Sequence, residues 1–282
     1  MTSIYTAPVY KLQELNNLFI ELTAKNCNQR CQSCYIDFGT NTGFSSVKKI
    51  VKDFISLDKI KDALSDLKHL QLHCIYLTGA EPMMHPDFNA ILRLCLKKCN
   101  VCICTNGSYL NEKKIRFLNR VESEGQSQIF FNLSLTHFEE LKNDSIKYRG
   151  NFRQTIFALK TLTRYNFSSV LSIQNYYDID PAELLEKFKQ IFQEQDIYHT
   201  DIQVKVSYPN YNDVNYSQPS QKTDCMYGRC LSANGIYSCP FLANDYRGRV
   251  GFSFKSFSEN ITAETDFCAT CSKNNNFMFT IG

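Results

Sequence analysis

Six short runs of apolar, β-branched and aromatic residues alternate with helical patterns along the chain, and this alternation restricts its fold most. Apolar residues recur at helical spacing after the potential cap Ser56, from Ile91, from Phe152, and after Pro181, which suits a first helical turn. Because successive strand–helix units force parallel strands with right-handed crossovers, we predict an α/β fold, a partial (β/α)6 barrel. The predicted strands cover residues 18–23, 74–79, 101–106, 129–135, 170–174 and 202–207.

Composition limits the classes of partner. The 282-residue chain is 43% hydrophobic, which suffices for one sizeable core and a smaller appendage. Its net charge of +3 comes without clustered Lys and Arg, so we expect no nucleic-acid partner and no membrane partner. The amino terminus lacks the features of a signal peptide, and no apolar run reaches the ~18 residues that span a bilayer. We therefore expect a cytoplasmic protein, in which a total of 13 cysteines indicates metal or redox use rather than a disulfide framework.

A three-cysteine loop follows the first predicted strand. Cys27, Cys31 and Cys34 have C-x3-C-x2-C spacing in CNQRCQSC. Three thiolates cannot complete a tetrahedral structural zinc site. On a [4Fe-4S] cluster they would leave one iron open for another ligand. The spacing therefore favours a cluster with an open, reactive iron.

Two further motifs follow the second and third predicted strands. TGAEP (78–82) combines small residues, which let the backbone approach a ligand, with Glu81, which can hold a ligand ammonium. TNG (105–107) contains Thr105 and Asn106, which are further candidate cofactor-binding residues. Because the carboxyl ends of parallel strands share one rim, we expect these motifs to meet the cysteine loop.

The cysteine loop and TGAEP resemble the signature motifs of the radical S-adenosylmethionine (SAM) superfamily. The resemblance implies a [4Fe-4S] cluster on the three cysteines, whose fourth iron chelates SAM. It maps the family's GGEP motif, which holds the SAM amino group, onto Gly79, Ala80 and Glu81, with Ala80 in place of a glycine. Polar residues on the fourth and fifth strands contact SAM in this family. The matching residues here are Asn132, Ser134 and Gln174.

The same resemblance implies a reaction. An electron from the reduced cluster cleaves SAM into methionine and a 5′-deoxyadenosyl radical, which abstracts a hydrogen atom from the substrate. A flavodoxin- or ferredoxin-type reductant is expected to supply the electron. His85 and His137 are the histidines nearest the strand ends, and His137 remains a candidate substrate contact.

The carboxyl-terminal part carries a second group of cysteines. After a polar connection (208–222), five cysteines surround a hairpin signal at Asn234-Gly235. They could hold a zinc ribbon or an iron–sulfur cluster. The candidate ligands are Cys225, Cys230, Cys239, Cys268 and Cys271.

This arrangement resembles the twitch domain, a shortened SPASM domain, and so implies one auxiliary [4Fe-4S] cluster with one cysteine to spare. Such enzymes mainly modify ribosomal peptides or small metabolites, so we expect an oxidative crosslink, thioether or dehydrogenation. The 26 residues before Cys27 are too few for the peptide-recognition domain of many peptide-modifying relatives. The predicted divisions are an extension (1–17), the barrel (18–207), a linker (208–222) and the auxiliary domain (223–282).

Two alternatives remain open from the residues. The first is an electron carrier, which the three-cysteine loop disfavours, since a carrier would give four cysteines to each cluster. A degenerate family member that binds SAM without cleaving it stays open because of Ala80. The second is a barrel with a structural zinc ribbon. The middle cysteines are predicted to be structural. They are Cys74, Cys95, Cys99, Cys102 and Cys104.

Overall fold

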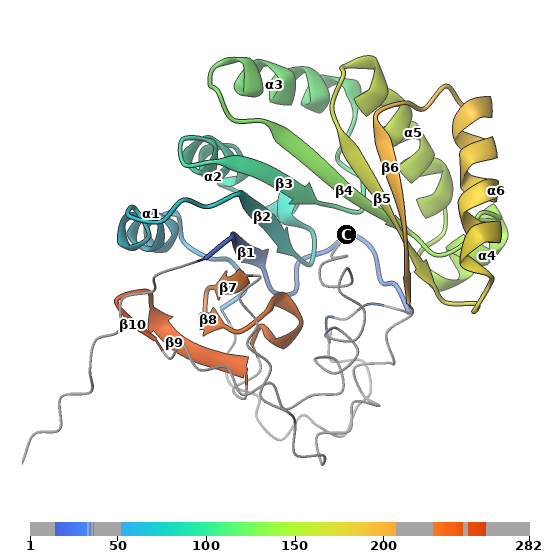
Figure 1. Cartoon of the computed structure of the whole chain (residues 1–282). Coiled ribbons are helices and arrows are strands. Elements are labelled where there is room, and N and C mark those ends of the chain that lie inside the picture. Colours follow the sequence, from blue (N-terminus) through green and yellow to red (C-terminus); the bar gives the residue numbers. More distant parts are fainter. Residues whose placement is uncertain are drawn as a thin grey trace, which may run out of the picture.

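The computed structural model describes residues 15–32, 34, 36, 52–206, 228–244 and 248–257. In these ranges the strands form one ten-stranded sheet in the order β10-β9-β8-β7-β1-β2-β3-β4-β5-β6 (Figure 1). All pairings from β1 to β6 are parallel, so the predicted α/β partial barrel is confirmed. Its strands are β1 (Asn17–Thr23), β2 (Cys74–Gly79), β3 (Asn100–Cys104), β4 (Ile129–Leu135), β5 (Ser169–Asn175) and β6 (Thr200–Val206).

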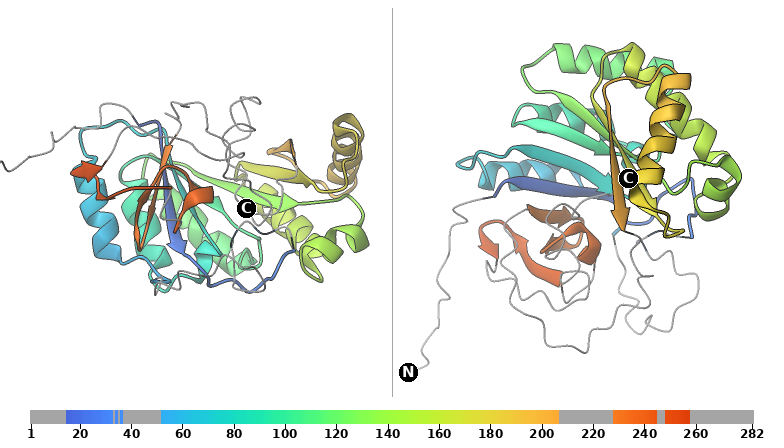
Figure 2. Two further views of the ribbon diagram at one scale, coloured as in Figure 1. Left: turned by 90° about the horizontal axis from the view of Figure 1, so that it is seen from below. Right: turned by 45° about the vertical axis from the view of Figure 1, so that its right-hand side comes forward.

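Helices cover one side of this curved sheet (Figures 1 and 2). Ser56 caps the first helix by accepting from the Lys59 N–H, and Asp180 caps the last, with Pro181 in its first turn. Two helices, α3 and α4, were not predicted: α3 has three buried apolar residues among charged ones, and α4 has only seven residues. The helices are α1 (Leu57–Asp66), α2 (Phe88–Leu96), α3 (Glu112–Ser123), α4 (Glu140–Ile146), α5 (Asn151–Arg164) and α6 (Pro181–Glu194).

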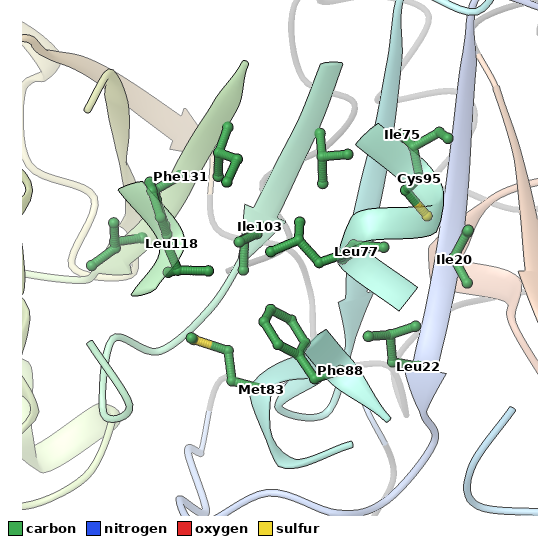
Figure 3. Close-up of a cluster of buried hydrophobic side chains, with 14 of the residues drawn as sticks. Ile20, Leu22, Ile75, Leu77, Met83, Phe88, Cys95, Ile103, Leu118 and Phe131 are labelled. Atoms are coloured by element: carbon green, nitrogen blue, oxygen red, sulfur yellow. The ribbon is translucent and has the colours of Figure 1, made fainter. Parts of the chain in front are cut away.

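The core lies between the helices and the sheet (Figure 3). Alternate strand residues such as Ile20, Leu77 and Ile103 are fully buried there, together with Cys95 of α2. The intervening residues face the concave side, where Phe19 and Cys104 belong to a second apolar cluster. The period-two pattern thus assigns one sheet face to the core and leaves the other for the site.

The predicted carboxyl-terminal hairpin is present and extends the barrel sheet. β7 (Gly228–Ser232) pairs antiparallel with β8 (Gly235–Tyr237) and parallel with β1. The turn occupies residues 233–234, one position before the expected Asn234-Gly235, because Ser232 pairs with Gly235 and its hydroxyl accepts from the Asn234 N–H at 3.0 Å. β9 (Arg249–Ser253) and β10 (Ser256–Phe257) complete the sheet edge. The linker at 208–222 lies outside the described residues, so the domain divisions stay predictions.

Candidate functional site

The loops after β1 and β2 are joined by backbone hydrogen bonds. The Ala80 N–H donates to the Thr23 carbonyl at 2.8 Å, and the Glu81 N–H donates to the Asn26 carbonyl at 3.0 Å. Cys27 follows Asn26 directly. The TGAEP turn and the cysteine loop are therefore adjacent at the carboxyl rim, as expected.

Gly79 makes this close approach possible. Its φ of +116° is a conformation that L side chains rarely adopt, and a Cβ there would lie 2.3 Å from the Thr23 carbonyl oxygen. Ala80 is not among the described residues with positive φ. The alanine that replaces a glycine of the family motif is thus accommodated without backbone strain.

Glu81 connects the second rim loop to the third. Its carboxylate is fully buried and accepts from the Thr105 hydroxyl at 2.9 Å, the Asn106 N–H at 3.0 Å and the Met83 N–H at 3.0 Å. Burial raises the pKa of Glu81 to about 7, although these donors oppose the shift. The Glu81 carboxylate therefore joins the TGAEP turn to TNG, and the Glu81 backbone joins the same turn to the cysteine loop.

The thiols of Cys27, Cys31 and Cys34 lie within electrostatic range of one another. Burial raises the pKa of all three, and for Cys34 burial, with a smaller contribution from the neighbouring thiols, brings the pKa to about 11. Lys147, a buried cation at the end of α4, lowers the pKa of Cys31 and Cys34. Three thiols on one loop beside a cation form a donor set that suits a cluster of thiolate-bound iron.

A chain of buried amides holds the cysteine loop against α5. The Thr136 N–H donates to Asn143 Oδ1 at 2.9 Å, and Asn143 Nδ2 donates to Asn151 Oδ1 at 3.0 Å. Asn151 Nδ2 then donates to Gln29 Oε1 at 3.2 Å, and Gln29 Nε2 donates to Gln154 Oε1 at 3.1 Å. The backbone N–H of Thr136 fixes the first amide and thereby the orientation of every amide that follows.

The polar residues of β4 and β5 are on the concave side. The Ser172 hydroxyl donates to Asn132 Oδ1 at 2.9 Å, and Lys147 Nζ donates to the Ser134 hydroxyl at 2.6 Å. Gln174 is half-buried near the end of β5. Sequence reasoning missed Ser172 and Lys147. Ser172 is two residues before Gln174 on the same strand, so strand alternation could have indicated that both face the same side. Lys147 follows a short helix that no sequence pattern predicted.

The second group of cysteines is described in part. Cys230 is fully buried on β7, and burial is the main reason that its pKa is raised. Cys239 is half-buried and close enough to raise the Cys230 pKa as well. Cys225, Cys268 and Cys271 lie outside the described residues. Among the residues that are described, no three His, Cys, Asp or Glu side chains converge closely enough to hold one metal ion.

Both histidines near the rim have local partners. His85 Nε2 lies 2.8 Å from the Ile55 carbonyl oxygen, and its Nδ1 accepts from the Asp87 N–H. His137 is buried, and its ring contacts Tyr177 edge-on at 5.1 Å between centroids. Burial lowers the pKa of His137, so its neutral form is favoured. The predicted structural role of Cys95, Cys102 and Cys104 agrees with their burial.

The fold and rim define an α/β partial barrel with a three-cysteine loop at the carboxyl ends of its strands. Residues 22–194 match the sequence pattern of the Radical SAM superfamily. The chain therefore belongs to the radical SAM superfamily. No curated protein sequence matches it.

Solved structures of similar fold include SuiB of Streptococcus suis bound to the precursor peptide SuiA (14% identity, TM-score 0.60). That match covers 88% of this chain and 64% of SuiB, so the chain spans less than two thirds of SuiB. The structure of anSMEcpe with bound AdoMet is similar (14%, TM-score 0.59, covering 93% and 83%). Methylornithine synthase, PylB, follows (15%, TM-score 0.51, covering 71% and 55%). At these identities the likeness concerns the fold. Among the described helices, none is long and apolar enough to cross a membrane.

Proposed function

We propose that this protein is a radical SAM enzyme. The observation that carries the proposal is the convergence of the cysteine loop, TGAEP and TNG at one rim, where Glu81 contacts Thr105 and Asn106 and bonds through its backbone to Asn26 beside Cys27. A [4Fe-4S] cluster on Cys27, Cys31 and Cys34 would supply the electron that splits SAM into methionine and a hydrogen-abstracting 5′-deoxyadenosyl radical.

The residues of the TGAEP turn would bind the amino group of SAM. The carbonyl groups of Gly79 and Ala80 are the acceptors that an ammonium requires. Glu81 adds a carboxylate, and its contacts with Thr105 and Asn106 hold the turn in place. The Thr78 hydroxyl, which is buried without a hydrogen-bond partner among the described residues, is a further polar group at this position.

The polar residues of β4 and β5 would bind the rest of SAM. Lys147 is a buried cation that acts electrostatically on Cys31 and Cys34, and it suits the carboxylate of SAM, with Ser134 beside it. Asn132 and Gln174 offer amide groups for the ribose hydroxyls. The apolar concave surface around Phe19 would keep water from a reactive radical.

We further propose an auxiliary cluster and a class of substrate. Cys239 packs against the apolar cluster that contains Cys230, which favours a shared site that Cys225, Cys268 and Cys271 would complete as an auxiliary [4Fe-4S] cluster. Four cysteine ligands would let this cluster accept an electron from a substrate radical. We therefore propose an oxidative modification of a peptide or small metabolite, with a flavodoxin- or ferredoxin-type reductant. The SuiB structure with its precursor peptide supports the peptide alternative.

The test is anaerobic reconstitution with iron and sulfide, followed by addition of SAM and dithionite. We expect about eight irons per chain and 5′-deoxyadenosine. Cys31→Ala should lose the SAM-binding cluster and the product, whereas the control Cys99→Ala, at the opposite end of β3 from the rim, should retain both. About four irons with tightly bound zinc would assign the carboxyl-terminal cysteines to a zinc ribbon. Absence of 5′-deoxyadenosine in the cluster-loaded protein would refute SAM cleavage.

A further inference from the structure

The sulfur of Cys27 has two N–H donors. The backbone N–H of Gln29 donates to Cys27 Sγ at 3.3 Å, and Asn106 Nδ2 donates to it at 3.6 Å. The Asn106 donor is a side chain from a different rim loop, the one after β3. Cys31 Sγ instead lies 3.9 Å from Gln29 Oε1, an acceptor. The two thiols thus have different hydrogen-bonding surroundings.

The orientation of the Asn106 amide is fixed by its neighbours. Its Oδ1 accepts from the backbone N–H of Ser108 at 2.9 Å, so the Nδ2 group must point the other way. There Nδ2 also donates to Asn28 Oδ1 at 3.0 Å. The Asn106 N–H in turn donates to Glu81 at 3.0 Å, which fixes the backbone. The donor is therefore directed at Cys27 Sγ before any cluster binds.

A donor in this position has a definite electrostatic effect. An N–H dipole that points at a cluster sulfur stabilises negative charge, and the reduced cluster carries one more electron than the oxidised cluster. Hydrogen bonds to the sulfurs therefore favour the reduced state and raise the reduction potential. The effect acts on the step that supplies the electron to SAM.

We infer that the side chain of Asn106 is a positioning residue that raises the reduction potential of the cluster through its hydrogen bond to Cys27 Sγ. This inference rests on the proposed function, because it requires a cluster on the three-cysteine loop. It gives the TNG motif a role that is distinct from contact with SAM. The backbone N–H of Gln29 donates to the same sulfur, but a side-chain substitution cannot remove this hydrogen bond.

The experiment is an EPR-monitored redox titration of the reconstituted protein without SAM. Asn106→Ala removes the donor and should lower the midpoint potential of the SAM-binding cluster. At the wild-type midpoint its ratio of reduced to oxidised cluster should fall, and a tenfold fall corresponds to 59 mV for a one-electron couple. The matched control Ser108→Ala removes the neighbouring hydroxyl contact to Asn28 and leaves the donor in place, so its midpoint should equal that of the wild type.

Two further arms complete the test. Asn106→Asp keeps the side-chain size and the oxygen that accepts from Ser108, but a carboxylate oxygen replaces the N–H donor. Its negative charge should lower the reduction potential more than Asn106→Ala does. In the wild type, exchange into D2O should add a deuterium coupling to the reduced cluster that weakens in Asn106→Ala. Equal midpoints and couplings in the wild type and both Asn106 variants would overturn the inference. A wild-type protein that takes up no cluster on the loop would instead overturn the proposed function, and the inference with it.

Discussion

Replacing Gly79 by alanine should destabilise the protein because two penalties act together. At φ +116° the alanine lies outside the favourable backbone regions, which costs about 1–3 kcal/mol. The new Cβ would also lie 2.3 Å from the Thr23 carbonyl oxygen, a backbone atom that cannot rotate away. The turn must therefore shift, and the hydrogen bond from Ala80 to Thr23 is lost at a cost of about 1 kcal/mol. Together we expect a loss of about 2–4 kcal/mol.

Two other glycines separate these penalties. Gly150→Ala meets no atom within 4 Å but has φ +84°, so it should cost about 1–2 kcal/mol from the backbone alone. Gly125→Ala meets no atom within 4 Å and has no positive φ, so it should change stability by less than about 0.5 kcal/mol. The assay is urea unfolding of the cluster-free protein under reducing, anaerobic conditions. If Gly79→Ala lowers the free energy of unfolding no more than Gly150→Ala does, Gly79 does not approach the Thr23 carbonyl as closely as the structure shows.

Three more predictions concern the buried polar residues Gln29, Glu21 and Lys147. Gln29→Leu leaves the buried Nδ2 donor of Asn151 unpaired, so the free energy of unfolding in urea should fall by about 2 kcal/mol. Reconstitution of this variant should also yield less iron per chain. Wild-type stability and iron content in the variant would contradict the amide chain. Burial raises the pKa of Glu21 from 4.5 to about 7, so the folded state binds more protons between these values and the free energy of unfolding should fall by up to about 3 kcal/mol as pH rises through them. Glu21→Gln should remove this contribution and leave that of Glu81, whose pKa burial also raises to about 7. A variant with the same pH profile as the wild type would refute the assignment. Lys147→Met should weaken SAM binding to the reconstituted protein about tenfold or more, whereas Lys142→Met, at an exposed ion pair, should not; equal affinities would exclude Lys147 from the carboxylate site.

The strands of the barrel could be predicted because each is a short apolar run bounded by polar turns. β2, for example, has the predicted bounds Cys74–Gly79, and β4 has the predicted bounds Ile129–Leu135. Helix α3 was not predicted because few of its residues are apolar and buried, and the rest of the segment is largely charged. Ile115 and Leu118 are among the buried ones. Such a helix is stabilised mainly by packing on the sheet.

The candidate site was only partly predictable. The positions of Cys27, Gly79 and Glu81 at one rim follow from the parallel strands, because their carboxyl ends meet there. The partners of Glu81 do not follow, since nothing in the sequence links it to Thr105. Lys147 gave no signal, because an isolated lysine after a short helix is usually exposed, yet here it is buried beside the cysteine loop.

The sequence by itself determined the strand–helix alternation, the cysteine spacing and the small residues of TGAEP, because these depend on local periodicity and on atoms near one another along the chain. Tertiary structure decided that Glu81 contacts Thr105, that β7 joins the edge of β1, and that Asn106 faces Cys27. Those outcomes depend on contacts between segments far apart in sequence, such as the 79 positions between Cys27 and Asn106. Only packing of the whole sheet brings such groups within hydrogen-bonding distance.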